Sequence, residues 1–260
     1  MIADVATREQ GRGDLSIGRV LARASEVIAA APLLFLGISL ATAALPQALL
    51  RFVVPPDEWT IRHAFAELLL VAVVALIAWA ALHYGAQALL LRVSVARLDG
   101  GREPLVVSVA GAAAVVAPML AMMLVFAMAA LAGTMLLIVP GIMLVVMWSV
   151  AAPVLVIERP GILAALARSR ALTRGHRWRV FGLLLLVYGT YWMAGVGLGV
   201  GTGLAVAGGA GTGSLITTGV TIVLATGFMA ISTAIQAALY VELRDGHDGP
   251  AGYRLRAIFA

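Results

Sequence analysis

Long apolar stretches follow one another along almost the whole of this 260-residue chain, with short polar connections between them. A helix needs about 20 apolar residues to cross the ~30 Å hydrocarbon core of a bilayer. Inside that core no water is present to bind free backbone groups, so a chain of this kind must satisfy them within its own helices. The sequence therefore predicts an all-α, polytopic membrane protein with a single integral membrane domain over residues 1–260.

Composition excludes the main alternatives. Hydrophobic residues make up 62% of the chain and charged residues 12%, whereas soluble domains average about 45–50% and about 25%. No cysteine is present, which excludes disulfides, thiolate nucleophiles and cysteine-bound metals. The net charge of +5 is more typical of cytoplasmic arginines in a membrane protein than of nucleic-acid binding, so we expect no nucleic-acid partner.

Six transmembrane helices are expected. They fall at residues 27–50, 64–91, 180–207 and 215–241, with two more within 105–157 on either side of Pro140-Gly141. These spans form three hairpins, with possible repeat units at 15–100, 103–158 and 160–250. The repeat rests on short matches such as Leu21-Ala22-Arg23 with Leu166-Ala167-Arg168, and chance similarity between Ala/Leu-rich segments explains them equally well.

The arginines predict the orientation. All 18 basic residues are arginine, and a chain rich in Ala, Gly and Val without lysine is typical of a GC-rich bacterial genome. Arg51 and Arg62 fall on one side of the six spans and the other 16 fall on the opposite side. Because cytoplasmic loops carry the excess of basic residues, we expect a bacterial inner-membrane protein with both termini in the cytoplasm.

Two segments have the periodicity of amphipathic helices that lie in the cytoplasmic interface. The first follows Asp14, and the second runs from Gly161 to Arg174, where Gly175 is a natural stop. Their apolar residues recur at helical spacing, as Ile17, Val20, Leu21, Ala24 and Val27 in the first segment and Ile162, Ala165, Leu166 and Leu172 in the second.

Most of the chain, from roughly Leu15 to Gly246, resembles a known family. The matching residues are Pro140-Gly141, the string from Pro153 to Glu158, residues 165–169 with Leu172 and Gly175, residues 178–182, and Tyr240, Leu243 and Arg244. They resemble the YciC-like membrane family, which is related to the membrane domain of glycerophosphoryl diester phosphodiesterases. The resemblance implies a six-helix bacterial inner-membrane protein. Relatives in that family are sometimes fused to a phosphodiesterase domain, but the resemblance does not imply this activity here. The catalytic barrel of those fusions needs some 200 or more residues, for which this chain has no room.

An arginine cluster after the fourth span is the main candidate site. Guanidinium groups match the geometry of phosphate, and each basic residue near an anionic leaflet adds ~1 kcal/mol of attraction. The sequence therefore predicts binding of anionic phospholipid headgroups, with membrane phospholipids as partners. The alternative is that these arginines only set topology. The cluster comprises Arg168, Arg170, Arg174, Arg177 and Arg179.

A cavity between the hairpins is a second candidate. Pro118 and Pro153 each remove a backbone hydrogen bond and permit a kink, and polar groups at membrane depth are candidates for function. The expected lining is His83, Tyr84, Gln87, Pro118, Pro153, Tyr191 and Gln236. The alternative for Gln87 and Gln236 is a hydrogen bond across a helix interface.

Nothing in the sequence indicates catalysis. It contains no nucleophile-elbow or zinc-protease motif and no lysine for a phosphate-binding loop. We expect no catalytic residues, metal or cofactor, and read Gly195, Gly199 and Gly203 as a ridge for close helix packing. The expected function is non-enzymatic: an envelope or lipid-handling membrane module. The alternatives are a transporter of a small solute or lipid and a scaffold that anchors a membrane or envelope protein. No oligomeric state is indicated.

Overall fold

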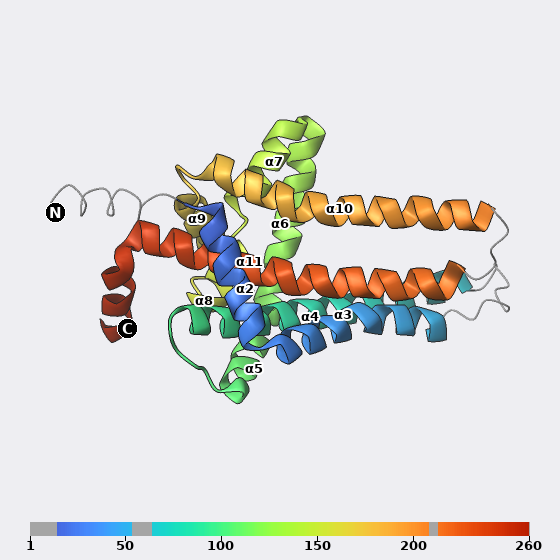
Figure 1. Cartoon of the computed structure of the whole chain (residues 1–260), viewed down its shortest axis with the longest axis horizontal. Coiled ribbons are helices and arrows are strands. Elements are labelled where there is room, and N and C mark those ends of the chain that lie inside the picture. Colours follow the sequence, from blue (N-terminus) through green and yellow to red (C-terminus); the bar gives the residue numbers. More distant parts are fainter. Residues whose placement is uncertain (1–14, 54–63, 208–212, 260) are drawn as a thin grey trace.

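The computed structural model describes residues 15–53, 64–207 and 213–259, and within these ranges every element of regular structure is a helix (Figure 1). The helices in chain order are α2 (Ile17–Ala30), α3 (Pro32–Val53), α4 (Ala64–Leu98), α5 (Leu105–Ala113), α6 (Val116–Leu136), α7 (Ile138–Met147), α8 (Ala151–Ile157), α9 (Ile162–Leu172), α10 (Arg177–Ala207) and α11 (Gly213–Phe259).

The predicted fold class is confirmed at the level of a helical protein with membrane-spanning segments. Within the described residues, five helical stretches are long and apolar enough to cross a membrane: Leu69–Leu98, Val116–Met135, Val139–Ile157, Arg177–Gly201 and Thr217–Gly249. The pair α2 and α3, which is bent by 92°, makes a sixth if it is counted as one span. These lengths and compositions are those of a polytopic membrane protein.

Apolar side chains point outward along the long helices. Leu70, Leu76, Leu124, Leu185 and Val200 are all more than half exposed. A soluble monomer rarely exposes a contiguous apolar surface of this kind, but a bilayer covers it. The most deeply buried large side chains include Leu90 and Leu91 in the second half of α4 and Tyr240 in the second half of α11.

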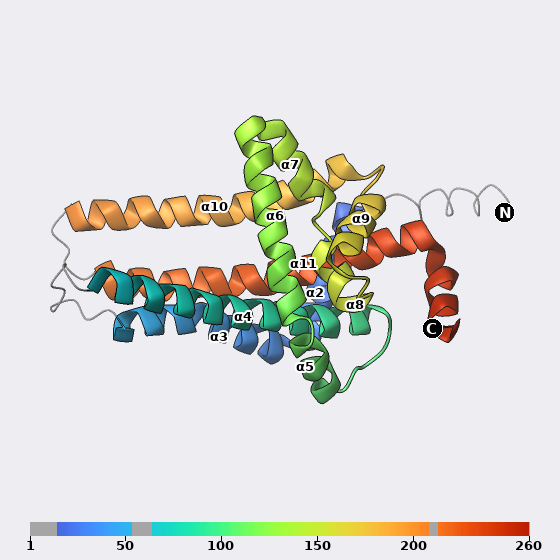
Figure 2. The same ribbon diagram turned by 180° about the vertical axis from the view of Figure 1, so that it is seen from behind.

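The long helices extend from a base of short helices. α3, α4, α10 and α11 run alongside one another, and α11 contacts each of the other three (Figures 1 and 2). α6 runs across them in both views, and α7 folds back against it. The pair α6 and α7 therefore does not run parallel to the pairs α3–α4 and α10–α11. The predicted layout of three transmembrane hairpins stays a prediction.

The first predicted span begins too early. It was expected from residue 27, but the helix is interrupted at Ala31 and the chain turns by 92° before α3 starts at Pro32. Residues 27–30 belong to α2, where Val27 is buried. The apolar character of both helices hides this break from a hydropathy reading. The break between the third and fourth spans lies at Leu137, so Pro140-Gly141 falls in the first turn of α7.

Pro118 and Pro153 each lie just after a break between two helices, where the sequence predicts a kink. Pro118 is the third residue of α6, and Pro153 is the third residue of α8. The first four N–H groups of a helix have no partner within the helix, so a proline in this turn breaks no hydrogen bond. Both prolines mark the start of a helix after a break at residues 114–115 and 148–150.

Both segments predicted to be amphipathic form helices, while their place in the cytoplasmic interface stays a prediction. α2 buries Val20, Ala24 and Val27, and packs against α11. α9 buries Ala165, Leu166 and Leu172 from the predicted arc, together with Ser169. Gly175 follows α9 with a positive φ of 89°, a conformation that favours glycine. Each of these short helices precedes a long pair, α3 with α4 and α10 with α11.

The predicted packing ridge of glycines on α10 is wrong for the described chain. A Cβ atom added at Gly195, Gly199 or Gly203 would meet nothing within 4 Å. The close glycine contact lies instead between α6 and α7, where a Cβ at Gly133 would come within 3.1 Å of the Gly141 Cα atom. Spacing of four along a helix therefore did not identify which glycines have a neighbour.

A charged end with two kinds of arginine

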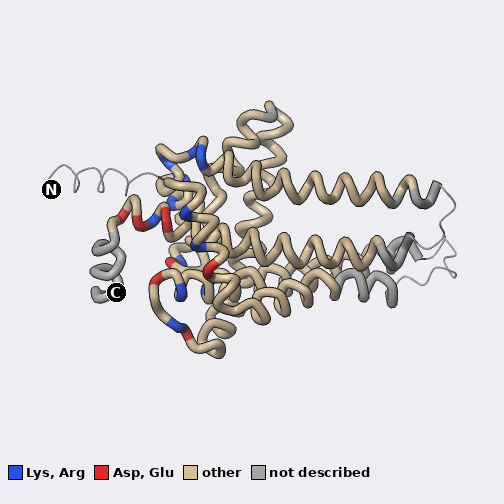
Figure 3. The backbone as a smooth tube through the Cα atoms, in the orientation of Figure 1, with Lys and Arg blue, Asp and Glu red and all other residues tan. Residues whose placement is uncertain are grey.

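Charged residues gather at one end of the molecule, around α2, α8, α9 and the adjoining ends of α4 and α11 (Figure 3). The described lengths of α3, α4, α10 and α11 that extend away from this end carry almost none. The arginine-rich segments that the sequence places on one side of the membrane therefore meet in space. The structure does not itself define which compartment this end faces, and the cytoplasmic assignment stays a prediction.

Arg244 on α11 has the most buried side chain of the ion-paired residues described at this end. Its side chain is 3% exposed, and its two Nη atoms lie 2.5 Å and 3.1 Å from the two carboxylate oxygens of Asp99. Asp245 accepts a further bond at 3.2 Å, and the Tyr240 ring lies 5.5 Å from the guanidinium carbon. This two-point contact joins the end of α4 to α11, because a guanidinium fork holds a carboxylate in a fixed orientation.

Glu242 holds α2 against α11. One of its oxygens lies 2.6 Å from Arg19 Nε and the other lies 2.9 Å from Arg23 Nη1. The Glu242 side chain is 10% exposed, whereas Arg19 and Arg23 are 45% and 36% exposed, so water reaches the arginine side of both contacts.

Arg168 is also engaged in ion pairs. It contacts Asp248 on α11, and its Nε lies 3.3 Å from Glu158 Oε2. Burial by itself lowers the pKa of Arg168, but the bonds to Asp248 and Glu158 outweigh it and raise the pKa. The Tyr240 hydroxyl donates to the other Glu158 oxygen at 2.9 Å. Arg168 therefore joins α9 to α11 through carboxylates, and it is not free to bind an incoming phosphate.

Another carboxylate, that of Glu103, orders the loop between α4 and α5. Glu103 accepts bonds from Arg92 and from the Ser108 hydroxyl, the latter at 2.9 Å. Burial by itself raises the pKa of Glu103, but the hydrogen bonds from Arg92 and Ser108 hold it below its ordinary value. The charged form is therefore the one that this loop stabilises.

The predicted headgroup cluster divides into two kinds of arginine. Arg168 is paired as described, and Arg179 Nη1 donates to the Leu15 carbonyl at 2.7 Å. Arg170 and Arg174 are exposed, and among the described residues neither they nor Arg177 have an ion-pair partner within 4.0 Å. The Nε atom of Arg177 is buried and donates to no partner in the described chain.

An apolar groove of about 330 Å³ lies beside Arg177, between α7 and α10. Trp178 stands at this groove with 86% of its surface exposed. The sequence reasoning identified Arg177 but missed the apolar lining, because nothing distinguishes these residues from other lipid-facing positions until α7 and α10 are brought together. The groove is lined by Val139, Ile142, Met143, Val146, Arg177, Trp178 and Phe181.

The predicted polar cavity is formed in part. Gln87 and Gln236 line an internal space of about 210 Å³ together with Ser149, whose buried hydroxyl has no partner in the described chain. Gln87 Nε2 donates to Gln236 Oε1 at 3.2 Å, which confirms the alternative that the two amides bond across a helix interface.

The other predicted lining residues lie elsewhere. His83 packs between Trp79 and Tyr84, with ring centroids 5.3 and 5.4 Å away. Tyr191 stacks on Phe228 at 4.0 Å, and the two prolines lie in the first turns of α6 and α8. None of these five residues lines the space that contains the glutamine pair.

In the part of the chain that the structure describes, the fold and the charged end define a class: a helical protein with five to six helices of membrane-spanning length and an ion-paired base. No group of three or more His, Asp or Glu side chains that could hold a metal ion occurs in the described part of the chain. No protein-family model matches the sequence, and no significant match was found among curated proteins or solved structures. The resemblance to the YciC-like family therefore stays a prediction.

Proposed function

We propose that this protein is a non-enzymatic, lipid-handling module of a bacterial inner membrane that binds anionic phospholipids at the α7–α10 groove. The observation that supports the proposal is the position of Arg177 and Trp178 directly at an apolar groove. A phospholipid carries the same two features, an anionic phosphate and apolar chains, next to each other.

The groove residues suit an acyl chain. Val139, Ile142 and Met143 are between 41% and 71% exposed. Within a bilayer the surroundings are already apolar, so an acyl chain is held in such a groove by close packing rather than by the hydrophobic effect. A cleft of about 330 Å³ accommodates part of one chain. Trp178 lies in the first turn of α10, and tryptophan is enriched at the ends of membrane-spanning helices, at the level of the headgroups.

The arginines suit the phosphate. Arg177 contributes a buried Nε donor without a partner in the described chain, and Arg174 lies exposed in the turn that precedes α10. Charge-assisted bonds from guanidinium to phosphate are stronger than neutral ones. Arg170 adds charge from α9, while Arg168 maintains the ion pairs that position α9.

The proposal is tested by native mass spectrometry of purified protein with its retained lipids. The variant R170Q/R174Q/R177Q keeps Arg168, so that its ion pairs with Glu158 and Asp248 are left in place. We expect this variant to retain about tenfold less anionic lipid, which corresponds to ~1.4 kcal/mol. A second variant, Ile142→Trp, fills the groove without altering charge and should also reduce retention.

Each outcome of this experiment bears on the proposal. Loss of anionic lipid in both variants supports a bound lipid whose phosphate contacts the arginines and whose acyl chain lies in the groove. Equal retention in all three proteins overturns the proposal, leaves the arginines as determinants of topology, and favours a scaffold that anchors a partner. Thermal unfolding of each variant in the same detergent shows whether a loss reflects an altered site or an altered fold.

A further inference from the structure

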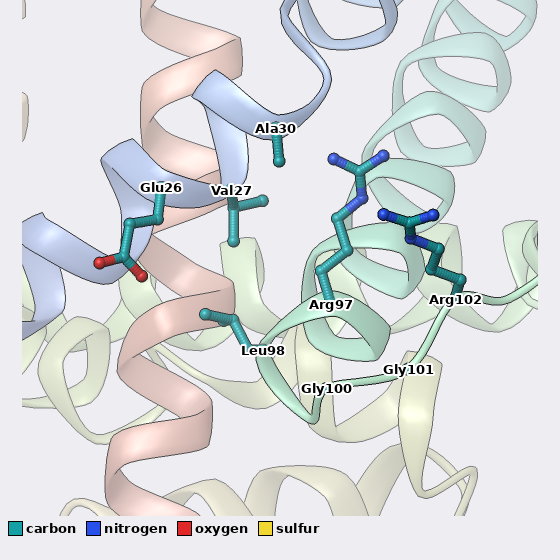
Figure 4. Close-up of a pocket in the computed structure, with 8 residues that line it drawn as sticks. All are labelled: Glu26, Val27, Ala30, Arg97, Leu98, Gly100, Gly101 and Arg102. Carbon is teal, nitrogen blue, oxygen red and sulfur yellow. The ribbon is translucent and has the colours of Figure 1, made fainter.

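A second cleft lies at the charged end, where the last turn of α2 meets the end of α4 and the loop after it (Figure 4). Its volume is about 560 Å³, and it shares no residue with the α7–α10 groove. It is lined by Glu26, Val27, Ala30, Arg97, Leu98, Gly100, Gly101 and Arg102.

The two arginines of this cleft carry uncompensated charge. Arg97 Nη1 is buried and has no hydrogen-bond partner in the described chain. Neither Arg97 nor Arg102 has a carboxylate of the described residues within 4.0 Å, although most of the surrounding arginines do. The adjacent Asp99 is committed to Arg244. A buried cationic donor without a partner is costly, so this arrangement favours an anion between the two guanidinium groups.

The turn after α4 creates the arrangement. Gly100 has a positive φ of 80°, and the Gly100 and Gly101 N–H groups donate to the carbonyls of Arg97 and Ala96 at 3.0 and 2.8 Å. The chain thereby reverses and brings Arg102 to the cleft that Arg97 lines. The C-terminal end of α4, next to the cleft, carries about half a negative charge from the helix dipole. The two positive charges of Arg97 and Arg102 outweigh it.

Glu26 does not neutralise these arginines. Figure 4 shows its carboxylate turned away from the two guanidinium groups, which extend to the same side of the cleft. Glu26 has no ion pair in the described part of the chain. The part of the cleft next to Arg97 and Arg102 is therefore left positive.

We infer that this cleft binds a phosphate group through Arg97 and Arg102. Guanidinium forks match the oxygens of phosphate, and phosphate supplies acceptors for both side chains at once. The cleft lies at the bend between α2 and α3, next to the apolar Val27 and Leu98. Its phosphate could come from a phospholipid headgroup or from a water-soluble compound, and the two sources share this chemistry.

Isothermal titration calorimetry on the full chain in a maltoside detergent separates the sources. One arm titrates inorganic phosphate and the other titrates dihexanoyl phosphatidylglycerol, both in phosphate-free buffer. We expect at least one ligand to bind, and R97Q/R102Q to weaken it about tenfold or more because charge-assisted bonds are lost. Variant R97K/R102K keeps the charge but loses the forks, and should bind with intermediate affinity.

Two controls make the result specific. E26Q removes a carboxylate that points away, so phosphate should bind as tightly as in the wild type or more tightly. R170Q/R174Q/R177Q alters only the α7–α10 groove and should leave the signal that depends on Arg97 and Arg102 unchanged, so failure of the lipid proposal is distinguishable from failure of this one.

The outcomes are decisive in either direction. Binding of inorganic phosphate assigns the cleft to a soluble ligand, and binding of the lipid alone assigns it to a headgroup; both support the inference. If neither ligand binds, or if R97Q/R102Q and R97K/R102K both bind as the wild type does, the inference is overturned.

Discussion

Arg244 is the residue on which the charged end depends most. Its guanidinium is almost completely buried and contacts Asp99, Asp245 and the face of Tyr240. Asp99 is 31% exposed, so the pair has one partner that water still reaches. Removal of the buried partner leaves polar groups without bonds, whereas a surface arginine is replaced at little cost.

We expect Arg244→Gln to lower the free energy of unfolding by ~2–3 kcal/mol, because Asp99 loses its two-point contact and α11 loses its link to α4. The measurement is unfolding in a single detergent, followed by circular dichroism. Arg170→Gln is the matched control, since Arg170 is exposed and unpaired in the described chain, and it should change stability by less than ~0.5 kcal/mol. Equal stability of the two variants would show that the ion pair does not hold the helices together.

At the scale of elements, the α6–α7 hairpin depends on two glycines. A Cβ at Gly141 would lie 2.9 Å from the Thr134 backbone nitrogen, and Gly133 faces the same contact. The Thr134 Cγ2 atom would lie nearer still to the added Cβ. Because the backbone obstructs as well as this side chain, only separation of the two helices relieves the contact. The pair Pro140-Gly141 in the sequence thus marks both a helix start and a close approach.

Gly141→Ala should therefore destabilise the protein by ~1–3 kcal/mol through overpacking. Gly197→Ala in α10 is the control, because a Cβ there meets nothing within 4 Å, and alanine favours a helix over glycine by up to ~1 kcal/mol. Thermal unfolding of both variants should move in opposite directions. A stabilised Gly141→Ala variant would mean that α6 and α7 are further apart than the structure shows.

At the scale of the whole molecule, the asymmetry of charge predicts orientation. The described arginines meet at one end, and the long helices extend from it (Figure 3). Because positively charged segments remain on the cytoplasmic side, this base should face the cytoplasm.

Single cysteines test this orientation cleanly, since the chain contains none. Ser25→Cys on α2 and Ala171→Cys on α9 are exposed at the base, and Gly203→Cys is exposed near the far end of α10. In intact cells, a membrane-impermeant maleimide should label Gly203→Cys alone, and the other two should react only after the membrane is permeabilised. Labelling of Ser25→Cys or Ala171→Cys in intact cells would reverse the assigned orientation.

The helical class, the long spans and the two amphipathic helices could be predicted from sequence because hydrophobicity and its period act locally. α10 lies within a few residues of its predicted range, and α9 buries the arc that its spacing indicated. The Gln87–Gln236 bond was among the alternatives for the same reason: polar groups at membrane depth need partners.

Only the tertiary structure decided how the arginines are used. Arg168 and Arg177 have the same chemistry and lie nine positions apart, yet one faces two carboxylates and the other faces a groove. Arg97 and Arg102 carried no signal beyond their charge. Whether a guanidinium is paired depends on carboxylates far away in the chain, such as Asp99 and Asp248. Hydrophobic period is a property of neighbours in sequence, whereas charge compensation is a property of neighbours in space.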